Sequence, residues 1–516
     1  MDKFVLYCVL VLLLWLLGKV WYSIWGKPKW VERQLKRQGI AGRPYKLLPF
    51  GDMKELVKLL TEAWSKPIRL NHQIVQRVDP FTLDIVQKYG NISYSWGWAT
   101  PRLIIKDPEL MKQVLSNKQG HFQKPPLNPL ILILTRGLQS LEGQDWARHR
   151  HIINPAFHLD KLKVMIPEFR TSCKEMIEQW KQMVINQENC ELDVWPQLQK
   201  LTADAISRAA FGTNYEQGKK IFRLQKELIQ LTLEAMQTFY IPGLRFVPTR
   251  KNLRRKKLDK EITAILRNVI QMKANALKTG QSRVDDLLGI LLQCNNQNSP
   301  LENASNGNLT IEEVKEECKA FYLAGQETTS SWLTWTIIVL AMHPDWQEKA
   351  RQEVLQACQN KEPDFEAVTH FKIVTMILYE VLRLYPPVIA LYQHTCKETK
   401  IGEINLPAGV DITLPTLLIH HDPELWGEDA DQFKPERFSQ GVSKASKDQL
   451  SAGFFPFGWG PRTCIGQNFA MLEAKVALAM ILQNFSFHLS PSYSHAPYTV
   501  MTLQPQHGAQ IILHKL

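Results

Sequence analysis

The sequence predicts a mainly α-helical fold with small β-sheets, carried on one N-terminal transmembrane helix. Residues 160–293 have helical periodicity and contain few glycines or prolines. A second helical pattern runs without a breaker over 311–342, where His343-Pro344 ends it. Short stretches with strand composition, such as 91–96 and 102–105, are bounded by turn residues, and the chain begins with a long apolar run.

Length and composition are typical of a large globular protein. The chain has 516 residues, 45% hydrophobic and 22% charged, so it can bury a sizeable core. The eight cysteines lie far apart and none forms a Cys-x-x-Cys pair, which argues against a zinc site or a disulfide framework. The net charge of +12 suits an anionic membrane surface or an acidic protein partner. No recognition motif accompanies this charge, so we expect no nucleic-acid partner.

Residues 1–26 are expected to be a membrane anchor. Residues 4–17 are apolar without a break and the apolar character continues to about Trp25, which is long enough for one helix across a bilayer. Lys and Arg residues cluster after this span whereas only Lys3 precedes it, so the positive-inside rule puts the body in the cytosol. A cleaved signal peptide is the alternative, but no small-residue cleavage site follows the run.

The rest of the chain divides into two expected parts. Residues 27–51 are basic at first and then rich in proline and glycine, which predicts a linker. Residues 52–516 would form one large domain that carries the chemistry.

Cys464 differs from the other cysteines in its surroundings. It lies in a run of turn formers, Phe457-Gly458-Trp459-Gly460-Pro461-Arg462-Thr463-Cys464-Ile465-Gly466, which a helical pattern over 467–482 follows at once. A thiol at a helix N-terminus, with Arg462 two residues away, is placed to ionise. Arg462 would also suit an acidic group of a cofactor. We therefore predict that Cys464 is the axial ligand of a haem iron, where a thiolate favours O–O cleavage. An incidental buried cysteine is the alternative.

The helix predicted over 311–342 contains a local conflict. It opens with a capping box, Thr310-Ile311-Glu312-Glu313, but its centre reads Ala324-Gly325-Gln326-Glu327-Thr328-Thr329. Glycine and threonine are unfavourable in a helix centre, and such conflicts mark functional places. A hydroxyl beside a haem iron can hold a water, and a neighbouring carboxylate can relay protons. Thr328 and Glu327 are therefore the candidate catalytic residues; a kinked core helix is the alternative.

Two further pairs have helical spacing. Trp146 and Arg150 are four residues apart and share a face. An indole N–H and a guanidinium suit the two propionates of haem, although a surface arginine packed on a tryptophan has the same spacing. Glu380 and Arg383 are three apart and can form an ion pair, which contributes little to stability if it is exposed.

These motifs together resemble those of the cytochromes P-450. The loop that ends in Cys464 resembles the haem-binding signature of the family, Ala324–Thr328 its oxygen-binding motif, and Glu380-x-x-Arg383 its buried ion pair. Finer features are similar to the plant 72 clan and especially to its A subfamily. They are Phe321–Thr329, Leu382–Val388, Trp426–Ala430 and His495–Thr499.

The resemblance implies a cytochrome P-450 fold that binds haem b. The haem contacts that it implies are Cys464, Trp146, Arg150, Arg462, Phe457, Gly458 and His394. Many relatives have an arginine that binds a propionate where this chain has His394, so that contact stays open. Glu380 and Arg383 would form a structural lock, with Arg437 of Pro435-Glu436-Arg437-Phe438 as its third member.

The resemblance also implies a reaction and partners. A monooxygenase of this kind takes electrons from NADPH through a separate flavoprotein reductase and inserts one atom of O2 into a lipophilic substrate. We expect a monomer, single-pass in the endoplasmic reticulum membrane with its catalytic domain in the cytosol, and a plant triterpenoid or iridoid as substrate. The alternatives are oxidation of a plant hormone (gibberellin, brassinosteroid or cytokinin), a haem-thiolate isomerase or dehydratase, and a non-catalytic haem-binding sensor.

Overall fold

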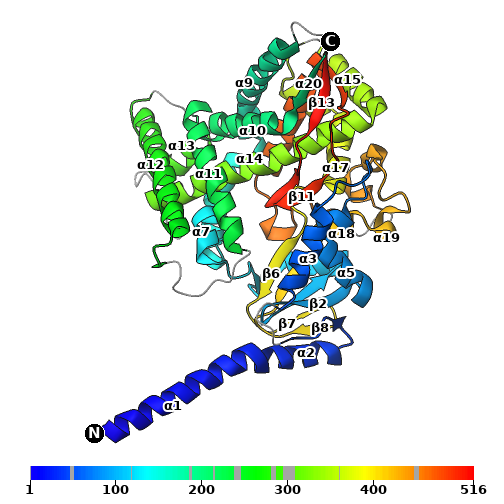
Figure 1. Ribbon diagram of the computed structural model, residues 1–516. Coiled ribbons are helices and arrows are strands. Elements are labelled where there is room, and N and C mark those ends of the chain that lie inside the picture. The colour runs from blue at the N-terminus through cyan, green and yellow to red at the C-terminus, as the bar shows by residue number, and fades with distance from the viewer. Residues whose placement is uncertain are drawn as a thin grey trace.

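The computed structural model of the chain is a largely helical body joined to a smaller sheet region, from which one long N-terminal helix projects (Figure 1). The structure describes residues 2–46, 51–117, 119–184, 189–212, 215–236, 246–280, 286–293, 308–359, 361–446 and 453–516. The C-terminus lies at the far end of the body from the N-terminal helix (Figure 1).

The helix α14 (Ile311–Met342) crosses the centre of the body (Figure 1). Its bounds are those that the sequence predicts, and the predicted capping box forms. The Thr310 hydroxyl accepts a hydrogen bond from the Glu313 N–H at 3.2 Å, and the Glu313 carboxylate accepts one from the Thr310 N–H at 2.7 Å. Most of α14 is buried, which explains why its hydrophobic residues do not follow one stripe.

Helices of different lengths make up most of the rest of the molecule, and some of them pack against α14. In chain order they are α3 (Met53–Trp64), α4 (Val75–Val78), α5 (Pro80–Tyr89), α6 (Pro108–Ser116), α7 (Pro129–Thr135), α8 (Gly143–Ile153), α9 (Leu159–Val184), α10 (Val194–Phe211), α11 (Tyr215–Met236), α12 (Arg250–Lys278), α13 (Leu287–Gln293), α15 (Pro344–Cys358), α16 (Phe365–His370), α17 (Ile373–Leu384), α18 (Thr416–His420), α19 (Pro423–Trp426) and α20 (Gln467–Asn484). One large hydrophobic core, which includes the fully buried Trp332 and Trp335 of α14, holds the helical body together.

The largest sheet has six strands in the order β1-β2-β3-β9-β6-β4. They are β1 (Ala41–Gly42), β2 (Ile92–Gly97), β3 (Thr100–Ile105), β9 (Asp411–Leu414), β6 (Leu391–Thr395) and β4 (Phe122–Gln123). The two strands predicted from composition, β2 and β3, form its central hairpin, with Ser95 opposite Arg102. One face of this sheet packs against a second hydrophobic core shared with α6.

The remaining strands form three small sheets. They are β10 (Phe485–Leu489) with β13 (Gln510–Lys515) and β5 (Cys190–Asp193), β11 (Pro497–Val500) with β12 (Thr502–Pro505), and β7 (Thr399–Ile401) with β8 (Ile404–Leu406). The β11–β12 hairpin turns at Met501, whose φ is +62°, and lies against α14.

The N-terminal helix does not end at the expected boundary of the anchor. The apolar α1 (Asp2–Trp21) continues through a π-helical turn, η1 (Tyr22–Gly26), into α2 (Lys27–Arg37) (Figure 1). Val31 and Leu35 of α2 are fully buried against the sheet region, and β1 pairs with β2 in parallel. Residues 27–42, which the sequence places in a linker, are therefore folded onto the body. Among the described residues, the helix that begins at Lys3 is long and apolar enough to cross a membrane.

Candidate active site

A cavity of about 280 Å³ lies between the loop before α20 and the middle of α14. Its walls are mainly apolar and come from segments that are far apart in the sequence. They are Phe157, Ile206, Phe321, Ala324, Gly325, Thr328, Thr329, Trp332, Leu382, Pro387, Val388, Leu391, Pro456, Phe457, Gly458, Arg462, Cys464, Ile465, Gly466, Phe469 and Ala470. Cys464, Thr328, Arg462, Phe457 and Gly458, which the sequence assigns to one site, thus line one cavity.

The loop that carries Cys464 is held by its own backbone. The Cys464 N–H donates to the Phe457 carbonyl at 2.8 Å, which closes the loop. Gly458 and Gly460 have φ values of +75° and +70°, in the region that favours glycine. A β-carbon on Gly460 would also lie 2.5 Å from the Leu115 carbonyl oxygen of α6. The glycines therefore let the loop turn sharply and approach α6 closely, so that the thiol faces the cavity.

The electrostatic setting of Cys464 differs from the one that the sequence predicts. Burial raises the pKa of the Cys464 thiol, and the Gly466 N–H and the Arg150 guanidinium oppose this rise only in part. Arg150, not Arg462, is the cation that acts on the thiol. The prediction that Cys464 ionises therefore stays a prediction, with Arg150 in place of Arg462 as the nearby cation that favours it. A metal ion bound in the cavity would add positive charge and so favour the thiolate.

Arg462 is tied to the segment before α8. It donates to the Leu141 carbonyl at 2.8 Å, forms an ion pair with Glu142, and lies 4.4 Å from the centre of the Trp146 ring. Arg150 donates to the Thr463 carbonyl at 2.9 Å, next to the thiol. Trp146, Arg150 and Arg462 thus lie close to the cysteine loop, and Arg462 is the one of the three that lines the cavity among the described residues, so their contact with propionates stays a prediction. Arg462 contacts Trp146 and the segment before α8, whereas Arg150 contacts the cysteine loop.

Two residues near Arg462 were not predicted from the sequence. Glu142 accepts the Lys124 N–H at 2.8 Å as well as the Arg462 guanidinium. Burial and the charge of Arg462 lower the pKa of Lys124, and Glu142 partly offsets this. The charged form of Lys124 is disfavoured because it lies partly buried near the like charge of Arg462. A bound anion would favour this charged form, so Lys124 suits a site that receives an anionic group. In the sequence, Lys124 stands before Pro125-Pro126, and this position gives no sign that it lies near Arg462.

His394 lies on β6, opposite Asp411 of β9. Its Nδ1 is 2.7 Å from the Asp411 carboxylate, which leaves Nε2 as the ring atom that can reach an added group. His394 is not among the described residues that line the cavity, whereas Leu391 on the same strand is. A propionate contact of His394 therefore stays a prediction.

Thr328 and Glu327 point in different directions from α14. The Thr328 side chain lines the cavity, and its hydroxyl donates to the Ala324 carbonyl one turn earlier at 2.8 Å. Glu327 is 8% exposed and turns towards β12, where the Gln504 amide lies 3.2 Å and the Thr502 hydroxyl 3.5 Å from its carboxylate. Burial raises the pKa of Glu327, against a smaller lowering by Lys226 and these two side chains.

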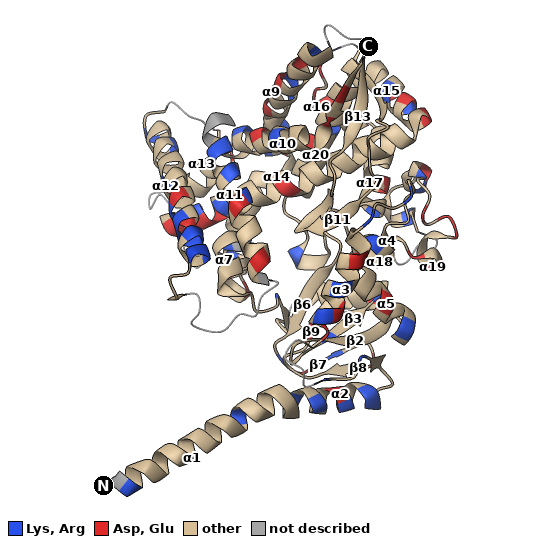
Figure 2. Cartoon of the chain, in the orientation of Figure 1, with Lys and Arg blue, Asp and Glu red and all other residues tan. Residues whose placement is uncertain are grey.

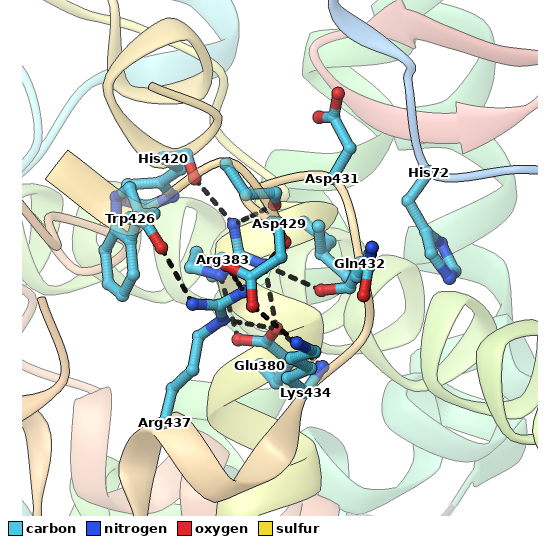
Figure 3. A network of polar contacts seen from close by, with 12 residues as sticks. His72, Glu380, Arg383, His420, Trp426, Asp429, Asp431, Gln432, Lys434 and Arg437 are labelled. Atoms are coloured by element: carbon cyan, nitrogen blue, oxygen red, sulfur yellow. Dashed lines mark hydrogen bonds and ion pairs between the residues drawn. The ribbon is translucent and has the colours of Figure 1, made fainter. Parts of the chain in front are cut away.

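The pair Glu380–Arg383 is fully buried on α17 (Figure 3). The Arg383 guanidinium donates to both Glu380 oxygens, at 2.8 and 2.7 Å. It also donates to the carbonyls of His420 and Ala430, at 2.8 and 2.7 Å. The short hydrogen bonds of this guanidinium thus go to the Glu380 carboxylate and to backbone carbonyls of a segment that is distant in the sequence.

Arg437 joins the lock mainly through other residues (Figure 3). Its Nε is 3.5 Å from a Glu380 oxygen, within ion-pair range but too long for a good hydrogen bond. Its terminal nitrogens instead donate to the Trp426 carbonyl at 2.8 Å and the Asp429 carbonyl at 2.7 Å. The Lys434 N–H, at 3.0 Å, is a closer donor to Glu380. The predicted third member is therefore present, but it fixes the chain around 426–429 more than it fixes Glu380.

His420 connects the lock to the cysteine loop. Its carbonyl accepts from Arg383, and its Nε2 accepts the Phe455 N–H at 2.9 Å, two residues before Phe457. Burial and the charge of Arg383 hold the pKa of His420 well below its usual range, so the ring stays neutral and can accept. Sequence inspection missed His420 because its neighbours in the chain, Ile419 and His421, show no motif.

The donor set fits a flat, mostly apolar ring with anionic groups at one edge. Apolar side chains make up most of the cavity wall, a single thiol faces its interior, and Arg150, Arg462 and Lys124 gather at one side. Iron protoporphyrin has this distribution: an apolar macrocycle, an iron that accepts a thiolate, and two propionates. The residues present therefore fit a haem.

Comparison with known proteins agrees with this chemistry. A family model described as cytochrome P-450 matches residues 66–513. The chain is 53% identical to CYP72A616 of Paris polyphylla, over 97% of this chain and 96% of that one. It is 48% identical to 7-deoxyloganic acid hydroxylase of Catharanthus roseus (96% and 95% covered) and 51% identical to 11-oxo-beta-amyrin 30-oxidase of Glycyrrhiza uralensis (96% and 94% covered).

A solved structure shares the fold. A cyanobacterial protein with bound retinoic acid, CYP120A1, superimposes with a TM-score of 0.75, covering 92% of this chain and 99% of that one. At 23% identity, this likeness concerns the fold alone.

Proposed function

The chain belongs to the cytochrome P-450 family, and from that premise we propose that it is a membrane-bound monooxygenase of a lipophilic plant terpenoid. Family membership implies a haem cofactor and monooxygenase chemistry. The observation that carries the proposal is the single apolar cavity lined by both Cys464 and Thr328.

The proposed roles follow from the contacts of each residue. Cys464 would hold the haem iron as its thiolate, and the haem would supply the redox chemistry that activates O2. The Thr328 hydroxyl, oriented by the Ala324 carbonyl, binds a water or oxygen atom beside that centre. Glu327 is the proposed proton source for this water; because its carboxyl points towards Gln504 and does not line the cavity, the proton would pass through intervening water.

The edge of the cavity would hold the carboxylate groups of the cofactor. Arg150 and Arg462 are the proposed propionate partners. The Trp146 ring packs on the Arg462 guanidinium and helps to hold it in place. Lys124 is a further cation at this edge, and the Nε2 atom of His394 is the remaining candidate donor.

The proposed substrate class rests on the walls of the cavity. Ile206, Phe321, Val388 and Leu391 present hydrocarbon to its interior, which suits the apolar skeleton of a terpenoid. Two relatives carry names that describe oxidation of an iridoid acid and of a triterpene. We therefore propose triterpenoids and iridoids as the substrates to test first.

The electron supply and the location complete the proposal. NADPH would provide electrons through a separate flavoprotein reductase, docked on the Cys464 side of a monomer. α1 would anchor the chain in the endoplasmic reticulum membrane with its body in the cytosol, because the basic residues follow the apolar span.

Replacing the proposed ligand tests the assignment. We expect Cys464→Ser to abolish the reduced-CO absorption band typical of a thiolate-bound haem. Cys396→Ser, which changes an exposed cysteine outside the cavity, is the matched control and should keep the band. A Cys464→Ser protein that keeps the band would refute the ligand assignment.

A substrate panel tests the reaction. Microsomes with this protein and a plant reductase would be given triterpenes, iridoids, diterpenes, gibberellins, brassinosteroids and cytokinins, with and without NADPH. We expect an NADPH-dependent oxygenated product from a triterpene or iridoid. An oxygenated hormone alone would move the chain to that class, a product without NADPH would indicate an isomerase or dehydratase, and CO binding without any NADPH use would indicate a sensor.

A further inference from the structure

A surface hollow lies where the membrane helix meets the folded body. Its lining residues are Trp25, Gly26, Lys29, Glu32, Arg33 and Lys36. All of them come from the end of η1 and one face of α2, so a short stretch of chain builds the whole hollow. Figure 2 shows that basic residues follow one another along α2.

The shape of the hollow depends on the π-helical turn. A β-carbon on Gly26 would lie 2.7 Å from the Tyr22 ring, so glycine lets this ring lie against the helix. Trp25 is fixed from the other side by Tyr45, with ring centres 5.9 Å apart, and Tyr45 in turn packs on Trp96 of β2 at 4.8 Å. π-helical turns often occur at functional sites. This one clamps the end of the membrane helix to the sheet.

The hollow carries more positive than negative charge, and hydrogen bonds hold two of its cations in place. The Glu32 side chain is 4% exposed, and its two oxygens bind the ammonium groups of Lys29 and Lys36 at 2.8 and 2.9 Å. Lys29 also lies 5.5 Å from the centre of the Trp25 ring. Arg33, which is exposed, is the third cation of the hollow. Three cations against one buried carboxylate leave a positive site with preset side chains, which suits a phosphate group.

The position of the hollow along the chain indicates which kind of phosphate compound it would bind. α1 has 20 residues and so a length of about 30 Å, the thickness of the hydrocarbon core of a bilayer. Trp25 and Lys29 come four and eight residues after its end, so in a membrane they would lie in the headgroup layer, where tryptophan rings and juxtamembrane basic residues interact with lipids. A lipid headgroup is already concentrated at this depth, whereas a soluble phosphate is not.

We propose that this hollow binds the headgroup of an anionic phospholipid of the cytosolic leaflet. Arg33, Lys29 and Lys36 bind its phosphate while Trp25 packs on its glycerol region. A bound lipid would fix the angle of the body on the membrane, because the hollow is clamped to β2 through Tyr45 and Trp96. The inference rests on the membrane anchoring proposed above.

The test measures which lipids stay with the protein. The haem-loaded full chain is reconstituted in bilayers of phosphatidylcholine with one tenth phosphatidylinositol and then extracted in mild detergent. The retained lipids are quantified by mass spectrometry. We expect phosphatidylinositol to be enriched over its share of the bilayer. A basic residue at an anionic surface contributes about 1 kcal/mol, so Arg33→Gln should lower this enrichment about fivefold, and Lys29→Gln with Arg33→Gln further.

The controls separate the possible outcomes. Arg37→Gln removes an exposed charge of α2 that does not line the hollow and should change the enrichment far less. An equal effect of Arg37→Gln, or no effect of the double variant, would overturn the proposal. Loss of enrichment when soluble inositol phosphate is added at equal concentration would show a phosphate site that is not lipid-specific and would overturn it too. All variants should float with phosphatidylcholine vesicles; failure of the wild type to float would contradict the anchor instead.

Discussion

Glu380 and Glu327 are both buried glutamates on long helices of the same core, but their surroundings differ. Glu380 is 0% exposed and receives two guanidinium donors from Arg383 and one backbone donor from Lys434, all within 3.0 Å. Glu327 is 8% exposed and accepts hydrogen bonds from two neutral side chains, Gln504 at 3.2 Å and Thr502 at 3.5 Å. A carboxylate that is saturated by charged donors is fixed, whereas one with weak neutral donors can exchange a proton. The first position serves the architecture and the second suits catalysis.

The largest effect is expected from breaking the saturated pair. Arg383→Ala would leave Glu380 and the carbonyls of His420 and Ala430 without their donors, which should cost about 3–5 kcal/mol of unfolding free energy. Arg170→Ala, in a pair with Glu362 that is 33% and 38% exposed, is the control and should cost under about 1 kcal/mol. Urea unfolding measures both. If Arg383→Ala fails to fold, Arg383→Lys should retain part of the stability; equal losses at positions 383 and 170 would contradict the comparison.

Replacement of Glu327 should lower the rate of turnover. Glu327→Gln keeps the shape of the side chain but removes the exchangeable proton, so we expect product formation to fall about 100-fold while the protein still folds. Glu473→Gln is a matched control, because Glu473 is 2% exposed, both its oxygens are unpaired, and it does not line the cavity. Steady-state turnover with peroxide measurement tests both variants. A loss of equal size in Glu473→Gln would remove the special role of Glu327.

The raised pKa of Glu327 gives a pH dependence with a defined sign. Because the folded pKa lies above the unfolded value near 4.5, the folded state holds a proton that the unfolded state releases. The contribution to stability is present below pH 4.5 and is lost as the pH rises through the folded pKa, by at most about 1.4 kcal/mol per pH unit. The stability of Glu327→Gln relative to wild type should therefore increase as the pH rises above 4.5. A difference that is independent of pH would show that the pKa of Glu327 is not raised.

The smallest effect concerns the hydrogen bonds that Glu327 does receive. Gln504 and Thr502 lower the pKa of Glu327 against the effect of burial. Gln504→Leu removes one neutral hydrogen bond, worth about 1 kcal/mol, so the pKa of Glu327 should rise by less than about one unit. The carboxyl stretch in infrared spectra, followed with pH, measures this shift. Gln352→Leu, on the exposed surface of α15, should leave it unchanged.

Local sequence patterns predicted the elements better than their contacts. The ends of α14 follow from Thr310 and Glu313 at one end and His343-Pro344 at the other, which act within a few residues. The partners of Arg383 lie 37 and 47 residues further along the chain, and they are backbone carbonyls that carry no sequence signal. His420 escaped notice for the same reason: its role depends on the distant Phe455 N–H.

The segment assigned to a linker illustrates a signal that was present but overlooked. Val31 and Leu35 are four residues apart among charged residues, which is the pattern of an amphipathic helix with one buried face. The basic composition of 27–37 and the proline and glycine of 39–51 suggested an extended connection instead. The tertiary structure supplies the surface of β1–β3 on which that face packs.

By itself the sequence determined which residues to single out: a lone cysteine in a glycine loop, a threonine and a glutamate in a helix centre, and a glutamate–arginine pair at helical spacing. These are short-range patterns, because capping, turn formation and helical spacing act over a few residues. The tertiary structure decided their electrical states and partners. It placed Cys464 on the wall of a cavity, where desolvation raises the pKa of its thiol, paired Arg462 with Glu142, and turned Glu327 away from the cavity towards Gln504. Desolvation and ion pairing depend on groups that are distant in sequence and meet only when the chain has folded.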